Sequence, residues 1–305
     1  MAGRGSLERL GHWFFYVALR LCGQRGGYLL LYPVIFSYLL FARGIKHRTA
    51  PYLTRRFPGH SPLRLFVHRL RNILSFGRVL VDRGWMGVNP KADIQGQLLG
   101  SEQLLRLVKE GKGIILVTAH MGNWQSALST LNFIPVKVHA LMQYDREAAA
   151  KHYFDLGKRK KTFEIIDADG PFGGMIEATA ALQRGEVVTI MADRYVKGTS
   201  SVVDFLGSPA RLPNAAYLLA AHVKAPVAVL LAAKTSPRQF HLKVWDIFYP
   251  RFETRENRQE ILDDCCRKFG RCLEKYLTLY PYQWYNFFDF WQDDANQKNT
   301  LQERQ

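Results

Sequence analysis

Residues 113–125, GIILVTAHMGNWQ, carry the strongest fold signal in the chain. The run from Ile114 to Thr118 is short, continuous and apolar, which is typical of a strand buried on both faces of a parallel sheet. A polar cluster, His120 to Gln125, follows where that strand has to end, and Gly122 allows a sharp turn there. Ligands of open α/β sheets bind just outside the carboxyl ends of the strands. The stretch therefore indicates both a fold class and a place for the chemistry.

Helix and strand patterns alternate on both sides of this stretch. The segment from Ser101 to Val108 combines an N-cap residue with an apolar face and predicts a helix just before the buried strand. Further strands are expected at residues 136–142, 187–191, 226–233 and 240–245, and further helices at residues 148–158, 174–183, 213–222 and 255–279. This alternation predicts an α/β fold with a largely parallel mixed sheet flanked by helices.

His120 is the strongest candidate for chemistry. It lies between the buried strand and a predicted helix, where the positive end of the helix dipole favours a neutral imidazole that can accept a proton. Five residues on a regular helix place two side chains about 140° apart. His120 and Gln125 can therefore meet only if His120 precedes the helix. A hydrogen-bonded structural histidine remains the alternative.

A second polar cluster follows the strand expected at residues 187–191. It contains Asp193, Arg194, Lys197 and Gly198. Because the carboxyl ends of parallel strands meet at one edge of a sheet, we expect this cluster on the same edge as His120. A solvated turn is the alternative interpretation.

Length and composition describe a folded chain that needs an anionic partner. The 305 residues are 48% hydrophobic, which excludes wholesale disorder and fits one large domain with an appended segment. The net charge of +16 comes mainly from residues 1–86, which hold fourteen basic side chains against Glu8 and Asp82. We do not expect nucleic acid as the partner, because the basic residues alternate with aliphatic stretches and no nucleic-acid-binding motif is present.

The first quarter of the chain also contains an apolar stretch, Tyr28 to Ala42. At fifteen residues it is shorter than the ~18 to 20 that span a bilayer upright, and Pro33 interrupts it. A cleavable signal peptide fits poorly, because charged residues are scattered through the preceding segment. The tyrosines inside the stretch and the basic residues after it predict a membrane-associated helix at an anionic, cytoplasmic surface. A buried core helix with a positive flank is the alternative.

The four cysteines have none of the spacings that mark a zinc site or a disulfide framework, so we expect free thiols in a reducing compartment. The histidines also lack metal-ligand spacing. The sequence therefore predicts neither a metal nor a cofactor.

The block from His120 to Gln125 resembles the His-x4-Asp/Glu motif of glycerolipid acyltransferases. Its His-x-Gly-Asn-Trp pattern is most similar to that of the lipid A biosynthesis (late) acyltransferases, the HtrB/LpxL-like branch of the lysophospholipid acyltransferase superfamily. Weaker segments occur in the order that this family shows: Arg56 to Pro58, Asp193 to Gly198, Val203 to Gly207 and Tyr280 to Trp284. The resemblance covers about residues 10–291.

The resemblance implies a glycerolipid acyltransferase-like fold that transfers a fatty acyl group from an acyl carrier protein or CoA thioester to a hydroxyl of a membrane lipid. His120 corresponds to the general base, and position 125 to the residue that orients it. Asn123 and Trp124 belong to the same block and are expected to contact substrate. The second cluster, with Asp193 and Arg194, is expected to hold a phosphate or a pantetheine arm. After another expected strand, Tyr144, Asp145 and Arg146 are expected to contact an anionic acceptor.

Position 125 departs from the family pattern, because the orienting carboxylate is replaced by Gln125. An amide offers no negative charge to a developing imidazolium. Three explanations stay open: a natural branch that works with glutamine or recruits another carboxylate such as Asp193, an engineered replacement of a glutamate, or a catalytically weakened protein.

The resulting hypothesis is an acyltransferase on the cytoplasmic face of a Gram-negative inner membrane, acting on a lipid A-like glycolipid or another membrane lipid. The alternatives are a lysophospholipid acyltransferase and a lipid-binding or assembly protein that has lost turnover. We expect an anchoring segment at residues 1–48, an acyltransferase domain at residues 49–292 and a polar tail at residues 293–305. The aromatic run from Tyr280 to Trp291 is expected either to contact the acyl chain or interface, or to pack on the core.

Overall fold

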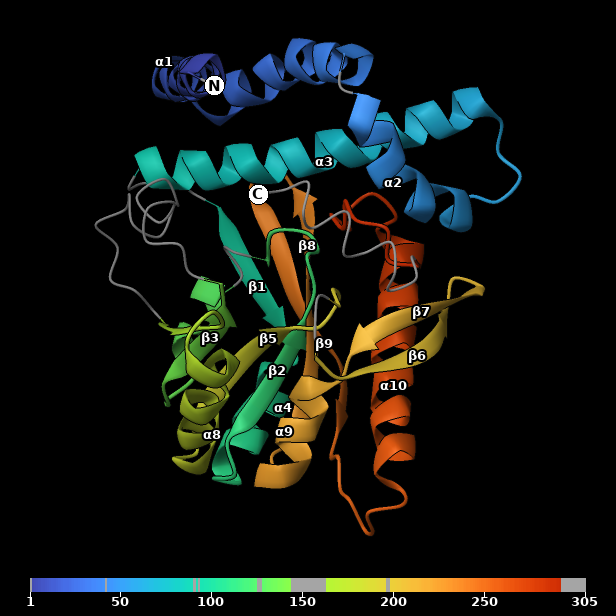
Figure 1. The fold of residues 1–305 in the computed structure, drawn as a ribbon. Coiled ribbons are helices and arrows are strands. Elements are labelled where there is room, and N and C mark those ends of the chain that lie inside the picture. Colours follow the sequence, from blue (N-terminus) through green and yellow to red (C-terminus); the bar gives the residue numbers. More distant parts are fainter. Residues whose placement is uncertain are drawn as a thin grey trace.

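The structure, a computed structural model, describes residues 2–41, 43–89, 92, 94–124, 128–143, 163–195 and 198–291. A seven-stranded sheet forms its centre, with the strand order β1-β9-β8-β2-β5-β3-β4 (Figure 1). The strands are β1 (Gln95–Leu99), β2 (Ile114–Thr118), β3 (Val138–Met142), β4 (Glu164–Asp167), β5 (Val187–Met191), β8 (Val227–Ser236) and β9 (Gln239–Phe248). The five strands from β8 to β4 run parallel, and only the β8–β9 pairing is antiparallel. The predicted α/β fold with a largely parallel mixed sheet is confirmed.

Helices cover both faces of the sheet, which explains why the β2 sequence is apolar at every position. Ile115 and Val117 pack in one cluster with α8 (Met175–Gln183), α9 (Ala215–Val223) and α10 (Arg258–Leu279). Ile114 and Leu116 pack on the opposite face with α4 (Ser101–Lys109) and with the 3-10 helix η1 (Leu128–Phe133). Each such side chain contributes about 1.5–3 kcal/mol when it leaves water.

Several elements differ from the expectation. β1 and β4 were not predicted, because they are short edge strands with exposed residues and no buried apolar run. A separate antiparallel hairpin, β6 (Ser200–Phe205) and β7 (Ser208–Pro213), was also missed. The helix expected from Pro213 begins two residues later, because Pro213 is the last residue of β7. The helix expected at residues 148–158 lies outside the described residues.

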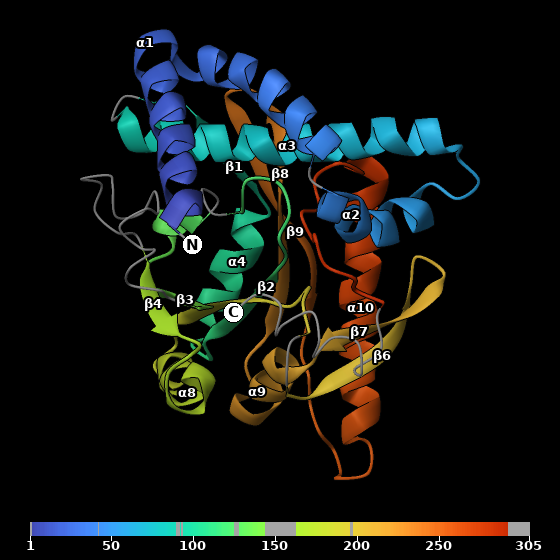
Figure 2. The same cartoon turned by 45° about the horizontal axis from the view of Figure 1, so that its top comes forward.

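Three N-terminal helices form a layer at one end of the sheet: α1 (Ala2–Phe41), α2 (Arg43–Arg56) and α3 (Pro62–Val88). The proposed domain boundary at residue 48 falls inside α2. α3 crosses the end of the sheet, and α1 lies on the outer side of α3 (Figures 1 and 2). Their shared core contains Leu19, Leu31, Ile35, Ile73 and Val81.

The outer surface of α1 exposes many large apolar side chains. They are Trp13, Phe14, Tyr16, Leu21, Leu29, Tyr32, Val34, Phe36 and Tyr38. Among the described helices, none alone has the length and apolar composition of a membrane span. The segments Trp13–Leu39 and Gly44–Arg56 reach the required length and apolar composition only when taken together, and they are bent by 99° relative to each other. An apolar surface of this extent on one helix is typical of an interaction site for a membrane or another protein.

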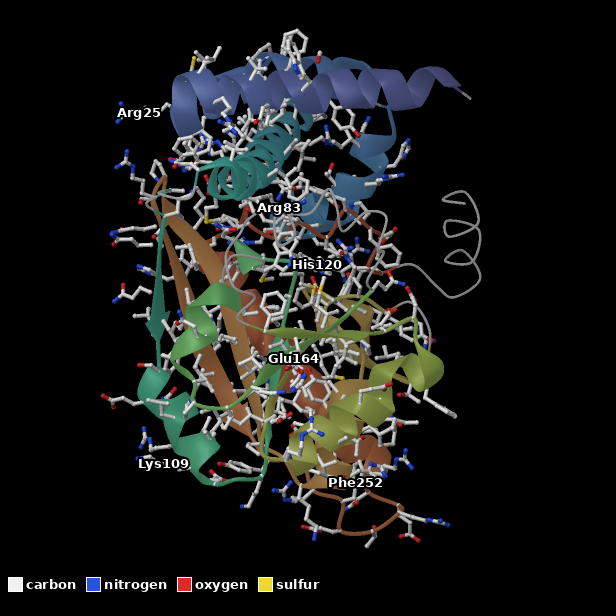
Figure 3. All side chains as sticks on the ribbon, turned by 90° about the vertical axis from the view of Figure 1, so that its left-hand side faces the viewer. Arg25, Arg83, Lys109, His120, Glu164 and Phe252 are labelled. Carbon is white, nitrogen blue, oxygen red and sulfur yellow. The ribbon has the colours of Figure 1, made fainter. Side chains whose placement is uncertain are left out.

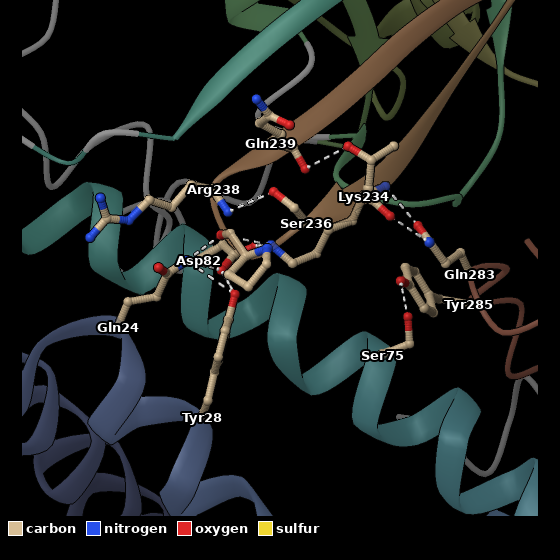
Figure 4. Close-up of polar contacts among 12 residues, drawn as sticks. Gln24, Tyr28, Ser75, Asp82, Lys234, Ser236, Arg238, Gln239, Gln283 and Tyr285 are labelled. Carbon is tan, nitrogen blue, oxygen red and sulfur yellow. Dashed lines mark hydrogen bonds and ion pairs between the residues drawn. The ribbon is translucent and has the colours of Figure 1, made fainter.

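A buried polar network fixes this N-terminal layer to the sheet (Figure 4). The Asp82 side chain of α3 is fully buried and accepts hydrogen bonds from Tyr28 and Gln24 of α1 and from the Lys234 ammonium of β8. Burial raises the pKa of the Asp82 carboxyl and lowers the pKa of the Lys234 ammonium, and each group offsets that effect for the other. This buried charge pair therefore links α1, α3 and β8 at one point.

The cysteines give a simple test of this packing. Cys265, Cys266 and Cys272 are buried in α10, and burial raises the pKa of each thiol to about 12, whereas Cys22 on α1 is exposed. Because the thiolate is the reactive form, we expect one fast-reacting thiol at pH 8 in the native protein and four after denaturation. Titration with a chromogenic thiol reagent measures this, and Cys22→Ser should remove the fast phase. Fast labelling of two or more thiols in native Cys22→Ser would contradict the burial of α10.

Candidate active site

Two neighbouring parallel strands bring the two polar clusters together. β2 pairs with β5 in a register that aligns Thr118 with Met191, the last residue of each strand. His120 lies two residues beyond Thr118, and Asp193 lies two residues beyond Met191. The two side chains therefore leave the same edge of the sheet at the same level. Figure 3 shows His120 at the end of the sheet nearest α3, whereas Lys109 and Phe252 lie at the opposite end.

His120 and Asp193 form a hydrogen-bonded dyad. His120 Nδ1 lies 2.8 Å from Asp193 Oδ1, and the His120 backbone N–H donates to Asp193 Oδ2 at 3.0 Å. The Asp193 side chain is fully buried, whereas the His120 side chain is 20% exposed. Within the described residues, His120 Nε2 has no hydrogen-bond partner. The dyad thus joins a buried carboxylate to a partly exposed ring.

Trp284, which sequence analysis did not single out, completes the carboxylate site. Its indole Nε1–H donates to Asp193 Oδ2 at 2.9 Å. The indole is 1% exposed and packs edge-on against Tyr52, Phe205 and Phe290. The aromatic run after residue 280 was the available signal, but nothing in its composition indicates which ring contacts Asp193.

These contacts keep Asp193 ionised. Burial by itself raises the pKa of the carboxyl, but the His120 ring, Arg194 and the Trp284 indole outweigh that effect and hold the pKa well below its usual range. An ionised carboxylate can only accept hydrogen bonds, so a neutral His120 must carry its proton on Nδ1. The lone pair of Nε2 then remains free to accept a proton.

Backbone contacts fix the turn that carries His120. The Tyr285 N–H donates to the His120 carbonyl at 2.9 Å, and the Gly122 N–H donates to the Gln283 carbonyl at 2.9 Å. Gly122 has a positive φ of 50°, and a Cβ there would lie 2.2 Å from the Ala232 carbonyl oxygen. Only glycine fits this close approach between the turn and β8. The C-terminal segment is therefore part of the site, and not only a cover for the core.

The other residues of the first cluster surround the dyad. The Trp124 ring lies 5.6 Å from the His120 ring, between centroids, and 6.0 Å from the Tyr285 ring. Asn123 is fully buried, and among the described residues neither its amide oxygen nor its amide nitrogen has a hydrogen-bond partner. An unsatisfied buried amide costs about 1–3 kcal/mol, a cost that is typical of sites completed by water or ligand.

The remaining residues of the second cluster, Arg194, Lys197 and Gly198, differ in what the structure shows of them. Arg194 donates to the Asn286 side chain at 3.1 Å and to the Tyr285 carbonyl at 3.0 Å, so it holds the C-terminal segment beside the dyad. Gly198 is exposed, with a positive φ of 97°. Three predicted site residues, Gln125, Arg146 and Lys197, lie outside the described residues. No group of three or more metal-ligating side chains occurs within the described part of the chain.

A family profile for bacterial lipid A biosynthesis acyltransferases matches residues 71–292, which is more than half of the chain. The chain belongs to this family. The resemblance seen in the His120 block is thereby confirmed. Curated proteins provided no match that could be counted as a relative.

The matched region begins in α3 and includes the whole sheet, His120, Asp193 and Trp284. Membership in the lipid A acyltransferase family makes acyl transfer to a lipid A-like lipid the general activity, and members of the family are generally membrane-associated. The exposed apolar surface of α1 agrees with this association.

Proposed function

We propose that this acyltransferase uses His120 as general base and Asp193 as its orienting partner, moving a fatty acyl group from an acyl carrier protein or CoA thioester to a lipid hydroxyl. The observation that carries the proposal is the 2.8 Å contact between His120 Nδ1 and Asp193, together with an Nε2 atom that has no hydrogen-bond partner in the described part of the chain. The contact supports the explanation in which a carboxylate other than position 125 serves the histidine. Gln125 is then a natural residue of a working site.

The proton path follows from the tautomer. Nε2 accepts the proton of the acceptor hydroxyl while the oxygen attacks the thioester carbonyl carbon. The carbon–sulfur bond then breaks, and the leaving thiolate takes the proton from the imidazolium as thiol. Asp193 stabilises the positive charge that the ring holds between these steps. No other proton donor is needed, since the ring receives and returns one proton.

The proposal also covers where the enzyme acts and which residues contact the lipids. The basic first 86 residues and the apolar surface of α1 support contact with an anionic leaflet, and we place the enzyme on the cytoplasmic face of an inner membrane. Asn123 and Trp124 are proposed to contact the reacting lipids, because they adjoin the dyad. Neither the acyl carrier protein nor CoA is favoured as the donor.

Acyl transfer from a labelled acyl thioester to a mixture of bacterial lipids tests the proposal. His120→Ala is expected to lower turnover by ~10²–10⁴-fold, the range that general bases contribute. His222→Ala is the matched control, because His222 is exposed on α9, where its ring nitrogen Nδ1 lies 2.8 Å from the Leu218 carbonyl of the same helix, at the end of the sheet opposite the dyad. Equal turnover in the wild type and in His120→Ala would remove the general-base assignment. Lipid binding without turnover in the wild type would favour the binding or assembly protein instead.

A further inference from the structure

A basic groove separates α3 from the C-terminal segment, outside the dyad. It has a volume of about 420 Å³, and its lining includes Arg71, Ser75 and Arg78 from α3 and residues 279–283 from the other side. Arg71, Ser75 and Arg78 lie at i, i+4 and i+7, which is one face of the helix. The two arginines are therefore about 10 Å apart along the axis.

The positive charge of the groove is not neutralised by any carboxylate of the described residues. Both arginines are exposed, and each donates a hydrogen bond to a tyrosine hydroxyl at 3.3 Å: Arg71 to Tyr282 and Arg78 to Tyr32. Their guanidinium groups also lie over aromatic rings, at 5.7 Å from the centroid of Tyr282 and 6.0 Å from that of Tyr28. Neither forms an ion pair with a carboxylate of the described residues. Asp82 is the one acidic residue of α3, and Lys234 already pairs with it. Two unpaired arginines facing one groove are typical of a phosphate site, since the guanidinium fork matches phosphate oxygens.

The lining also contains apolar side chains, and these indicate which kind of phosphate compound would bind. Leu74 and Leu279 line the same groove, and Leu279 is 62% exposed. α1, with its exposed apolar surface, lies on the outer side of α3 (Figure 2). A free inorganic anion would gain nothing from the leucines, whereas a lipid places apolar chains next to its phosphate.

We propose that this groove binds the phosphate of a membrane-lipid headgroup, with Arg71 and Arg78 as the anion ligands. The inference rests on the proposed function in one respect, namely that the protein acts at the surface of a membrane. The groove is one layer of side chains away from the dyad: Ser75 Oγ lies 3.0 Å from the Tyr285 hydroxyl, and the Tyr285 N–H donates to the His120 carbonyl. A lipid held there would keep the mouth of the site at the leaflet surface.

Calorimetric titration of the full chain in a neutral detergent, with soluble dihexanoyl phosphatidic acid as the probe, tests this. Arg71→Gln/Arg78→Gln is expected to weaken binding at least about tenfold, because two charges next to the phosphate are lost. The matched control is Arg258→Gln/Arg271→Gln, which removes the same charge from exposed positions of α10 and should bind as the wild type does. Inorganic phosphate and 4′-phosphopantetheine are titrated in parallel, and both should bind more weakly than the lipid.

The outcomes separate the possible ligands. Unchanged lipid binding by Arg71→Gln/Arg78→Gln, or an equal loss in the control variant, would overturn the groove as a site. Equal or tighter binding of inorganic phosphate or 4′-phosphopantetheine would overturn the lipid as its ligand. His120→Ala is expected to retain wild-type lipid affinity, so a failed general-base assignment leaves this result intact.

Discussion

Asp193→Asn is expected to lower turnover about 10⁴-fold, as the equivalent change does in a serine protease triad, without unfolding the protein. The physical reason is the tautomer of His120. Asp193 Oδ2 receives two donors, the His120 backbone N–H and the Trp284 indole N–H. In the asparagine variant the amide oxygen must take that position, because an amide nitrogen there would face two donors.

The amide nitrogen of the variant therefore faces His120 Nδ1 and donates to it. His120 then carries its proton on Nε2 and cannot accept one from the acceptor hydroxyl. Single-turnover rates with a labelled acyl thioester measure the effect, and thermal unfolding checks that the fold persists. Turnover within tenfold of the wild type would show that Asp193 does not set the tautomer.

Gln125→Glu is the matched comparison, because it restores the carboxylate that the family pattern places at position 125. If Asp193 already orients His120, the change should leave turnover within about threefold, since a second carboxylate adds little to a ring whose Nδ1 is already held. A large gain in turnover would instead identify Gln125 as an impairment, natural or engineered.

Asp82→Ala is expected to cost about 3–5 kcal/mol of unfolding free energy, the range for removing one partner of a buried ion pair. The Lys234 side chain is only 10% exposed, so the variant leaves an ammonium group without its counter-charge in a largely buried position. At the same time Tyr28 loses the acceptor of its hydroxyl and Gln24 loses one of its three acceptors, and the contact between α1 and the sheet weakens. Chemical denaturation in a neutral detergent measures the loss.

The double variant Asp82→Ala/Lys234→Met separates the charge effect from the packing effect. It should be more stable than Asp82→Ala alone, because no unpaired charge remains buried. Lys112→Ala breaks an ion pair with Glu110 in which the lysine side chain is 53% exposed, and should cost only about 0–1 kcal/mol. A double variant no more stable than Asp82→Ala would show that the network acts through shape and not charge.

The sheet was predictable because its central strands are buried on both faces. β2 and residues 227–233 of β8 appear in the sequence as continuous apolar runs, and β5 is apolar except at Thr189. His120 and Asp193 were predictable as members of one edge, because both follow parallel strands. Their contact depends on the direct pairing of β2 with β5. The apolar pattern of a sequence predicts strands but not the order in which they pair.

The remaining parts of the site depend on long-range contacts. Trp284 reaches Asp193 from 91 residues away in the sequence, and Lys234 reaches Asp82 from 152 residues away. A tryptophan in an aromatic run and an aspartate in a basic helix have the same local pattern whether or not they meet such partners. The edge strands β1 and β4 were missed for a related reason, since partial exposure removes the apolar signal.

The alignment of β2 with β5 has a consequence for how this enzyme can diversify. His120 and Asp193 are positioned by ladder hydrogen bonds and not by the chain that connects them, so insertions or deletions between residues 124 and 187 that preserve β3 and the sheet leave the two groups facing each other. Under the proposed mechanism, the length of that connection can therefore vary while the proton-transfer pair stays in place.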